Sequence, residues 1–134
     1  MVQCTILNIG KDIMMILKLR SFARWASSEN ISDSAIKEAV DEINRGLIDA
    51  DLGAGLLKKR VAREGAGKSG GFRTMLAFRD KNRAIFILGF PKSKQDNIGN
   101  DELRKLKILS KELLSASDAE IRKRILAGDL IEIK

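Results

Sequence analysis

The sequence predicts an α+β fold in which helices pack on a β-sheet. Residues 57–63 and 72–79 divide between two faces with the two-residue period of β-strands. In the second segment one face has Phe72, Thr74, Leu76 and Phe78, and the other has Arg73, Met75, Ala77 and Arg79. Residues 21–28 and 32–46 instead repeat apolar side chains at intervals of three and four, as amphipathic helices do. At 134 residues the chain has the length of one domain and can bury its own core, so we treat residues 1–134 as a single domain.

Positive charge is concentrated in the predicted sheet. Residues 58–94 contain eleven Lys and Arg against two Asp and Glu, a net charge of +9, whereas residues 1–57 sum to −2 and residues 95–134 to zero. A cationic sheet between nearly neutral segments favours a polyanionic partner, and the phosphate backbone of nucleic acids is the commonest one. The alternative is a basic surface that is merely solvated.

The composition excludes several kinds of site. The chain has no histidine and one cysteine, Cys4, which excludes a disulfide framework, a zinc site of the usual Cys/His kind and an imidazole-based triad. We therefore expect no metal and no cofactor. The longest apolar stretch, residues 84–91, is much shorter than the roughly 20 residues that a membrane span needs. No secretory signal pattern appears at the N-terminus, so we expect a cytoplasmic protein.

The N-terminal residues leave the start of translation open. Residues 1–13 have no clear period, and the pair Met14-Met15 precedes a short β-like run, residues 16–19. Translation from Met14 or Met15 would make residues 1–13 an upstream extension, which we expect to be loosely ordered.

Two helices are predicted after this first strand. Phe22 and Trp25 lie on one apolar face of the first helix, and Asn30 suits its C-terminal turn. Ser32 is a good N-cap for the second helix. The two helices should form a hairpin on the sheet, with Trp25 in the core rather than stacked on a ligand.

A loop and a central strand complete the predicted sheet region. Residues 46–55 form a glycine-containing loop, whose Asp49 and Asp51 are too few ligands to indicate a metal site. Residues 84–90 are an almost continuous apolar run, as expected for a strand buried on both faces.

The glycine-rich segment between the first two long strands resembles a nucleotide-binding loop only superficially. Residues 62–69 match the loose phosphate-loop pattern that ends in Gly-Lys-Ser. Such a loop must open a helix, whereas Gly70-Gly71 and a two-residue period follow here. We reject a nucleotide site and expect a hairpin loop, whose glycines still allow backbone N–H groups to approach an anion.

The C-terminal part is predicted to be helical. Pro91 ends the central strand, and residues 101–115 keep an apolar helical face. Residues 116–134 contain a last short helix, which a capping box at residues 117–120 opens, and a tail. In this tail residues 130–133 alternate weakly, which leaves a further strand open.

Four cations of the basic region are candidates for binding one phosphate. Lys58 and Arg60 are two residues apart and share a strand face, and Arg73 begins the next strand. Lys92 leaves the end of the apolar strand. The alternative is that some of these side chains extend over the sheet edge into solvent.

The sequence resembles the RelE/HigB family of type II toxin–antitoxin systems, within the RelE/ParE superfamily. The resemblance spans roughly residues 16–114 and is specific in combination rather than in any single piece. It rests on these motifs: Phe22-Ala-Arg-Trp25, Leu57-Lys-Lys-Arg-Val-Ala-Arg63, Gly67-Lys-Ser-Gly-Gly71, Phe72-Arg-Thr, Gly89-Phe-Pro-Lys-Ser and Asn97-Ile98. It implies a RelE-like fold, with a helical hairpin on a curved, mostly antiparallel four-stranded sheet plus C-terminal helices.

The resemblance also implies an activity. Family members are mostly mRNA interferases, endoribonucleases that cleave mRNA on the ribosome by attack of the ribose 2′-OH on the adjacent phosphate. The implied catalytic residues are Lys58, Arg60, Arg73 and Lys92, and the implied RNA-binding residues are Lys59, Arg63, Lys68, Arg79 and Lys94. The implied partners are mRNA, the ribosome and a cognate antitoxin with a helix-turn-helix DNA-binding domain.

This chain departs from the family pattern in two ways. It has Lys92-Ser-Lys-Gln95 where many relatives have Lys-x-Glu-Arg, and it has no Tyr or His to act as acid or base. The general base is therefore left open between Lys58 and Lys92. Two other functions also stay open. One is a non-catalytic RNA- or ribosome-binding module, or a degenerate toxin that kept only the cationic surface, and the other is a ParE-like action on gyrase.

Overall fold

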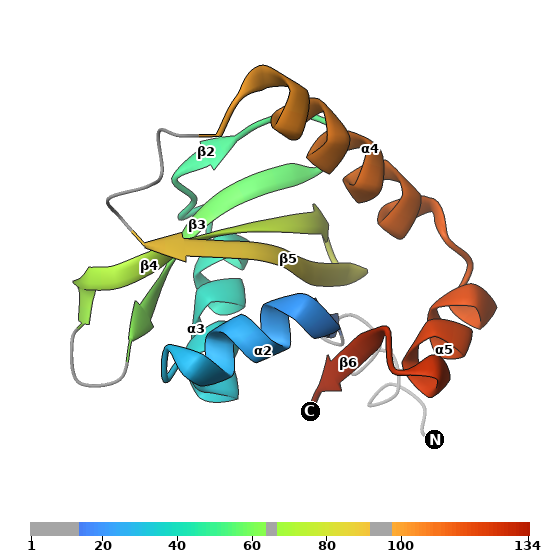
Figure 1. Ribbon diagram of the computed structural model, residues 1–134, viewed down its shortest axis with the longest axis horizontal. Coiled ribbons are helices and arrows are strands. Elements are labelled where there is room, and N and C mark those ends of the chain that lie inside the picture. Colours follow the sequence, from blue (N-terminus) through green and yellow to red (C-terminus); the bar gives the residue numbers. More distant parts are fainter. Residues whose placement is uncertain (1–13, 64–66, 92–97) are drawn as a thin grey trace.

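The computed structural model describes residues 14–63, 67–91 and 98–134, with the side chains of residues 63 and 67–70 left out (Figure 1). The expected N-terminal extension, residues 1–13 with Cys4, lies outside the described residues. The elements are β1 (Met15–Leu19), α2 (Arg20–Ser28), α3 (Asp33–Asn44), β2 (Ala50–Asp51), β3 (Leu56–Arg63), β4 (Gly67–Arg79), β5 (Arg83–Pro91), α4 (Asn100–Ser115), α5 (Asp118–Ala127) and β6 (Leu130–Ile133).

The strands form one mostly antiparallel sheet, which confirms the predicted α+β class. Its order is β2-β3-β4-β5-β1-β6, and β1 pairs with β5 in parallel while the other neighbours are antiparallel. The predicted count of four strands is wrong, because β2 and β6 add one strand to each edge. β2 has two residues, too few to show a period. In β6, Leu130 and Ile133 are buried and the two residues between them are exposed, which breaks the alternation.

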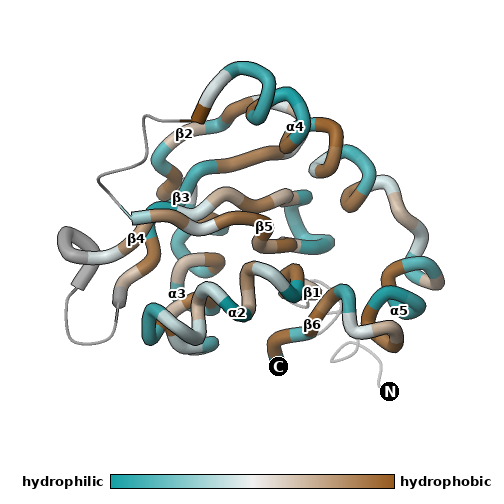
Figure 2. The backbone as a smooth tube through the Cα atoms, in the orientation of Figure 1, coloured by the Kyte–Doolittle hydropathy of each residue, from teal (hydrophilic) through white to brown (hydrophobic). Residues whose placement is uncertain are grey.

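Helices cover both faces of the sheet. Figure 1 shows α4 on one side of the strands and the hairpin of α2 and α3 on the other. The hairpin core includes Phe22, Ile36 and Phe86, and the opposite core includes Leu17, Ile85, Leu113 and Ile121. In Figure 2, β5 is largely hydrophobic, and hydrophobic and hydrophilic residues alternate along α4. This is expected for a strand covered by helices on both faces and for a helix with one face on the sheet.

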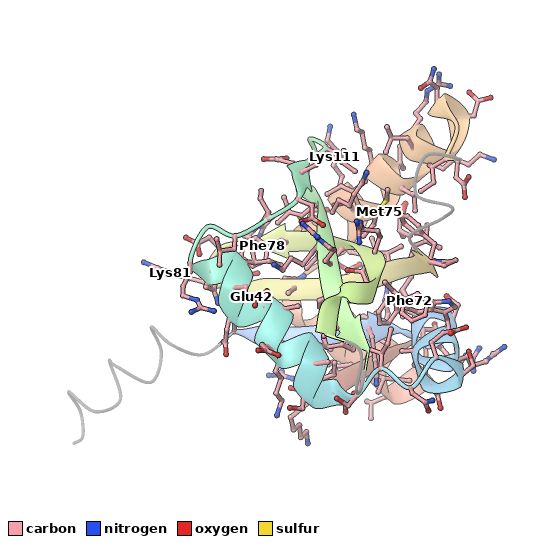
Figure 3. The ribbon with its side chains drawn as sticks, turned by 90° about the vertical axis from the view of Figure 1, so that its left-hand side faces the viewer. Glu42, Phe72, Met75, Phe78, Lys81 and Lys111 are labelled. Carbon is pink, nitrogen blue, oxygen red and sulfur yellow. The ribbon has the colours of Figure 1, made fainter. Side chains whose placement is uncertain are left out.

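Alternate residues of β4 point to opposite faces, as predicted. Phe72 and Leu76 pack in the hairpin core, whereas Met75 and Ala77 pack in the core under α4 and α5. In Figure 3, Phe72 lies toward α2 and Met75 toward α4. Sheet register therefore decides which residues of the basic strands face which helices.

The predicted helix ends are confirmed. The Ser32 hydroxyl accepts a hydrogen bond from the backbone N–H of Ala35 at the start of α3. Ser117 and Glu120 form the expected capping box of α5. Such caps stabilise a helix by about 1 kcal/mol each, so local sequence sets these boundaries.

The glycine-rich segment is more regular than the expected hairpin loop. β4 already begins at Gly67, so a strand rather than a helix carries the Lys-Ser pair, and this supports the rejection of a phosphate-loop site. Residues 64–66 lie outside the described residues. A Cβ at Gly71 would overlap the carbonyl oxygen of Val61, where the β3–β4 register shifts. The glycine is required for this close strand approach.

Trp25 is a core residue, as predicted. Its ring makes an edge-on contact with Phe72 at 5.2 Å between centroids and lies 5.6 Å from the Phe22 ring. A Cβ at Gly89 would overlap the Trp25 ring, so this ring packs directly on the backbone of β5 and holds α2 against the sheet.

We predict that Phe86→Ala destabilises the protein by about 3–5 kcal/mol, because it empties a fully buried site in the hairpin core. The measurement is the free energy of unfolding from urea denaturation. Leu126→Ala is the control, since that side chain is 87% exposed and its loss should change stability by less than about 0.5 kcal/mol. Equal losses in both variants would contradict the two-core arrangement.

Candidate phosphate-binding site

β3 and β4 bring three of the four candidate catalytic residues together. Arg60 is the register partner of Arg73, and Lys58 is the partner of Met75, two residues along β4. Lys58, Arg60 and Arg73 therefore share the face of the sheet on which α4 packs. Lys92, the fourth candidate, lies outside the described residues. The predicted convergence holds for the three cations that the structure describes.

The three cations line one open pocket of about 400 Å³. Its other described lining residues are Ile48, Asp49 and Ala50. The Arg60 side chain is 45% exposed, whereas Arg73 is 8% exposed. A phosphate entering this pocket would meet one mobile guanidinium at the surface and one guanidinium fixed by its surroundings.

Arg73 is a buried charged residue. It lies on β4, a central strand between β3 and β5. Burial of a charged group costs free energy unless other groups compensate for it. Arg73 nevertheless lines the cationic pocket, so its guanidinium lies where an anion could reach it.

Asp49 belongs to the same site, and nothing in the sequence pattern pointed to it. Its backbone N–H donates to the carbonyl oxygen of Lys58 at 3.0 Å, which fixes the segment before β2 alongside β3. Its Oδ1 lies 3.5 Å from Nε of Arg60. The one available signal was its place shortly before the strand that carries Lys58 and Arg60.

Lys59, implied as an RNA-binding residue, is not brought together with the other cations. It points to the hairpin face, is 4% exposed, and its Nζ lies 2.8 Å from Oε1 of Glu42 on α3. Burial lowers the pKa of Lys59, and Arg60 and Arg45 lower it further, whereas Asp49 raises it. We therefore leave Lys59 out of the proposed RNA surface, because strand alternation turns it into the core.

The other implied RNA contacts are placed only in part. Arg79 is exposed, but it lies six residues beyond Arg73 along β4, about 20 Å at a strand rise of about 3.4 Å per residue. The backbones of Arg63 and Lys68 lie in β3 and β4, and their side chains are outside the description. Lys94 lies outside the described residues. None of these four is shown to line the pocket.

Within residues 14–63, 67–91 and 98–134, no group of three or more Cys, Asp or Glu is arranged to hold a metal ion. In the same part of the chain, no helix is long and apolar enough to cross a membrane.

We predict that Glu42→Ala destabilises the protein by about 3–5 kcal/mol, because it leaves the Lys59 ammonium buried without this carboxylate. Thermal and urea unfolding measure the loss. Glu38→Ala is the matched control on the exposed face of α3 and should change stability by less than about 0.5 kcal/mol.

The double variant Glu42→Leu/Lys59→Met removes both charges and should recover most of the stability that Glu42→Ala loses. If the double variant is as unstable as Glu42→Ala, packing rather than the ion pair explains the loss.

Comparison with known protein families gives one finding of direct relevance. A family model described as the RelE toxin of the RelE/RelB toxin–antitoxin system matches residues 14–133. The matched segment includes every element from β1 to β6 and therefore the whole candidate site. Comparison with individual curated proteins gives no match.

Proposed function

Because the chain belongs to the RelE family of toxins of toxin–antitoxin systems, we propose that it is an mRNA interferase that acts in the cytoplasm. In this proposal it cleaves ribosome-bound mRNA by attack of a ribose 2′-OH on the adjacent phosphate and so inhibits translation. The observation that carries the proposal is the convergence of Lys58, Arg60 and Arg73 on one pocket.

The pocket has the charges that this reaction needs. Attack on the phosphodiester concentrates negative charge on the non-bridging oxygens in the transition state. Two guanidinium groups, from Arg60 and Arg73, can each make paired hydrogen bonds to such oxygens. Fixed donors of this kind typically contribute about 3–4 kcal/mol to transition-state stabilisation. Lys58 lines the same pocket and would add a third charge near the departing 5′-oxygen.

We predict that Arg60→Ala lowers the rate of mRNA cleavage on programmed ribosomes by about 10²–10³-fold, because it removes one transition-state donor. Cleavage is measured by mapping new 5′ ends after incubation with the purified protein. Arg122→Ala removes the same charge from the exposed face of α5 and should leave the rate unchanged. A normal rate for Arg60→Ala would remove Arg60 from the site.

Arg73→Ala should likewise abolish growth arrest on expression. Because Arg73 is 8% exposed, its unfolding midpoint is measured alongside, and Arg73→Lys provides a charged variant with a smaller change in packing. Wild-type protein that binds ribosomes but leaves mRNA uncut would favour the non-catalytic module. A change in DNA supercoiling would favour an action on gyrase.

The family also implies a cognate antitoxin. We propose that an acidic or amphipathic antitoxin segment covers Lys58, Arg60 and Arg73 or displaces α4, and that the antitoxin carries a helix-turn-helix DNA-binding domain. The charge map supports direct masking, because residues 58–94 carry a net +9 in a cell rich in RNA.

We predict that Lys58→Glu/Arg60→Glu weakens the antitoxin complex and reduces the dependence of its Kd on salt, because it reverses two charges at the interface. Binding is measured by calorimetry at several salt concentrations. Arg122→Glu/Lys123→Glu makes the same charge change on the exposed face of α5 and should bind normally. Equal affinity of the first variant at every salt concentration would mean that neutralisation occurs elsewhere.

A further inference from the structure

We propose that Asp49 is the general base of the reaction and accepts the proton of the attacking 2′-OH. This inference rests on the proposed ribonuclease function and assigns the role that the sequence left open between two lysines. It starts from the chain's composition: with no histidine and no tyrosine, the usual proton acceptors of this chemistry are absent from the whole sequence.

The position of Asp49 singles it out among the acids. Among the described residues that line the cationic pocket it is the one carboxylate, and its side chain is 22% exposed. The backbone hydrogen bond to Lys58 holds the segment against β3, so the carboxylate has a fixed place beside the cations. Its Oδ1 lies 3.5 Å from Nε of Arg60, so the carboxylate is adjacent to a guanidinium proposed to bind the phosphate.

A carboxylate in this pocket requires an explanation, because it repels the phosphate that the cations attract. A residue that only weakened binding would be unfavourable in an RNA-binding site. A catalytic role would explain why a carboxylate is present despite this repulsion. The attacking 2′-OH is next to the phosphate that it attacks, so its base must also lie beside that phosphate.

The proposed step is balanced. Asp49 takes the proton from the 2′-OH as the 2′-oxygen forms a bond to phosphorus. The bond between phosphorus and the 5′-oxygen breaks, and that oxygen takes a proton from the Lys58 ammonium or from water. The products are a 2′,3′-cyclic phosphate and a 5′-OH, and Asp49 returns its proton to solvent. Lysine could replace Asp49 as base only after losing its own proton first.

Asp49→Asn tests the proposal, because the amide oxygen can still accept a hydrogen bond from Arg60 but cannot take up the proton. We expect the single-turnover rate on programmed ribosomes to fall by about 10²–10⁴-fold. The Kd for an uncleavable 2′-deoxy mRNA should stay the same or become tighter. Asp51→Asn removes a charge two residues away, outside the pocket lining, and should keep the wild-type rate.

Asp49→Glu keeps a carboxylate and should retain more activity than Asp49→Asn. A role confined to holding Arg60 predicts that Asp49→Asn costs nothing further in an Arg60→Ala background, whereas loss of the base lowers the rate in both backgrounds. A rate loss of less than about tenfold in Asp49→Asn, or an equal loss of RNA binding, would overturn the assignment. If wild-type protein leaves mRNA uncut, the proposed function itself fails. If wild-type protein cleaves mRNA and Asp49→Asn cleaves it as fast, only the assignment of Asp49 fails.

Discussion

The register between β3 and β4 is the constraint on which the site depends. It places Arg60 directly opposite Arg73, and Lys58 lies two residues from Arg60 along β3 on the same face. The Thr74 hydroxyl donates to the carbonyl oxygen of Lys59 at 2.8 Å and adds a buried cross-strand bond to this ladder. A slip of one residue would turn the cations of one strand to the other face, so the pocket exists only in this register.

The same alternation gives neighbouring basic residues different tasks. Lys58 and Arg60 face the pocket, while Lys59 between them is drawn into the hairpin core and paired with Glu42. This ion pair ties β3 to α3 behind the site. A buried pair adds little net stability over apolar packing, but separating its two charges is costly, so a register that turned Lys59 away from Glu42 would be disfavoured.

The parts of the structure that were predictable from sequence are those set by local patterns. Convergence of Arg60 and Arg73 follows from strand period and a short connection, and the Ser32 cap follows from its own helix. The burial of Lys59 was not predictable, because it depends on a carboxylate supplied by a helix far along the chain. The position of Asp49 depends on β2, which follows it directly. This strand has two residues, too few to show a strand period in the sequence.

The facing arginines of β3 and β4 have an electrostatic cost that a bound anion would reduce. Like charges directly opposite in a ladder destabilise a sheet, so the Arg60 and Arg73 pair costs stability in the empty protein. Asp49 offsets part of that repulsion at Arg60. A bound anion would remove more of it, since a phosphate can engage both guanidinium groups together. If the proposed function is correct, RNA would stabilise the cationic strands on binding, and an acidic antitoxin segment would compete with it for the same charges.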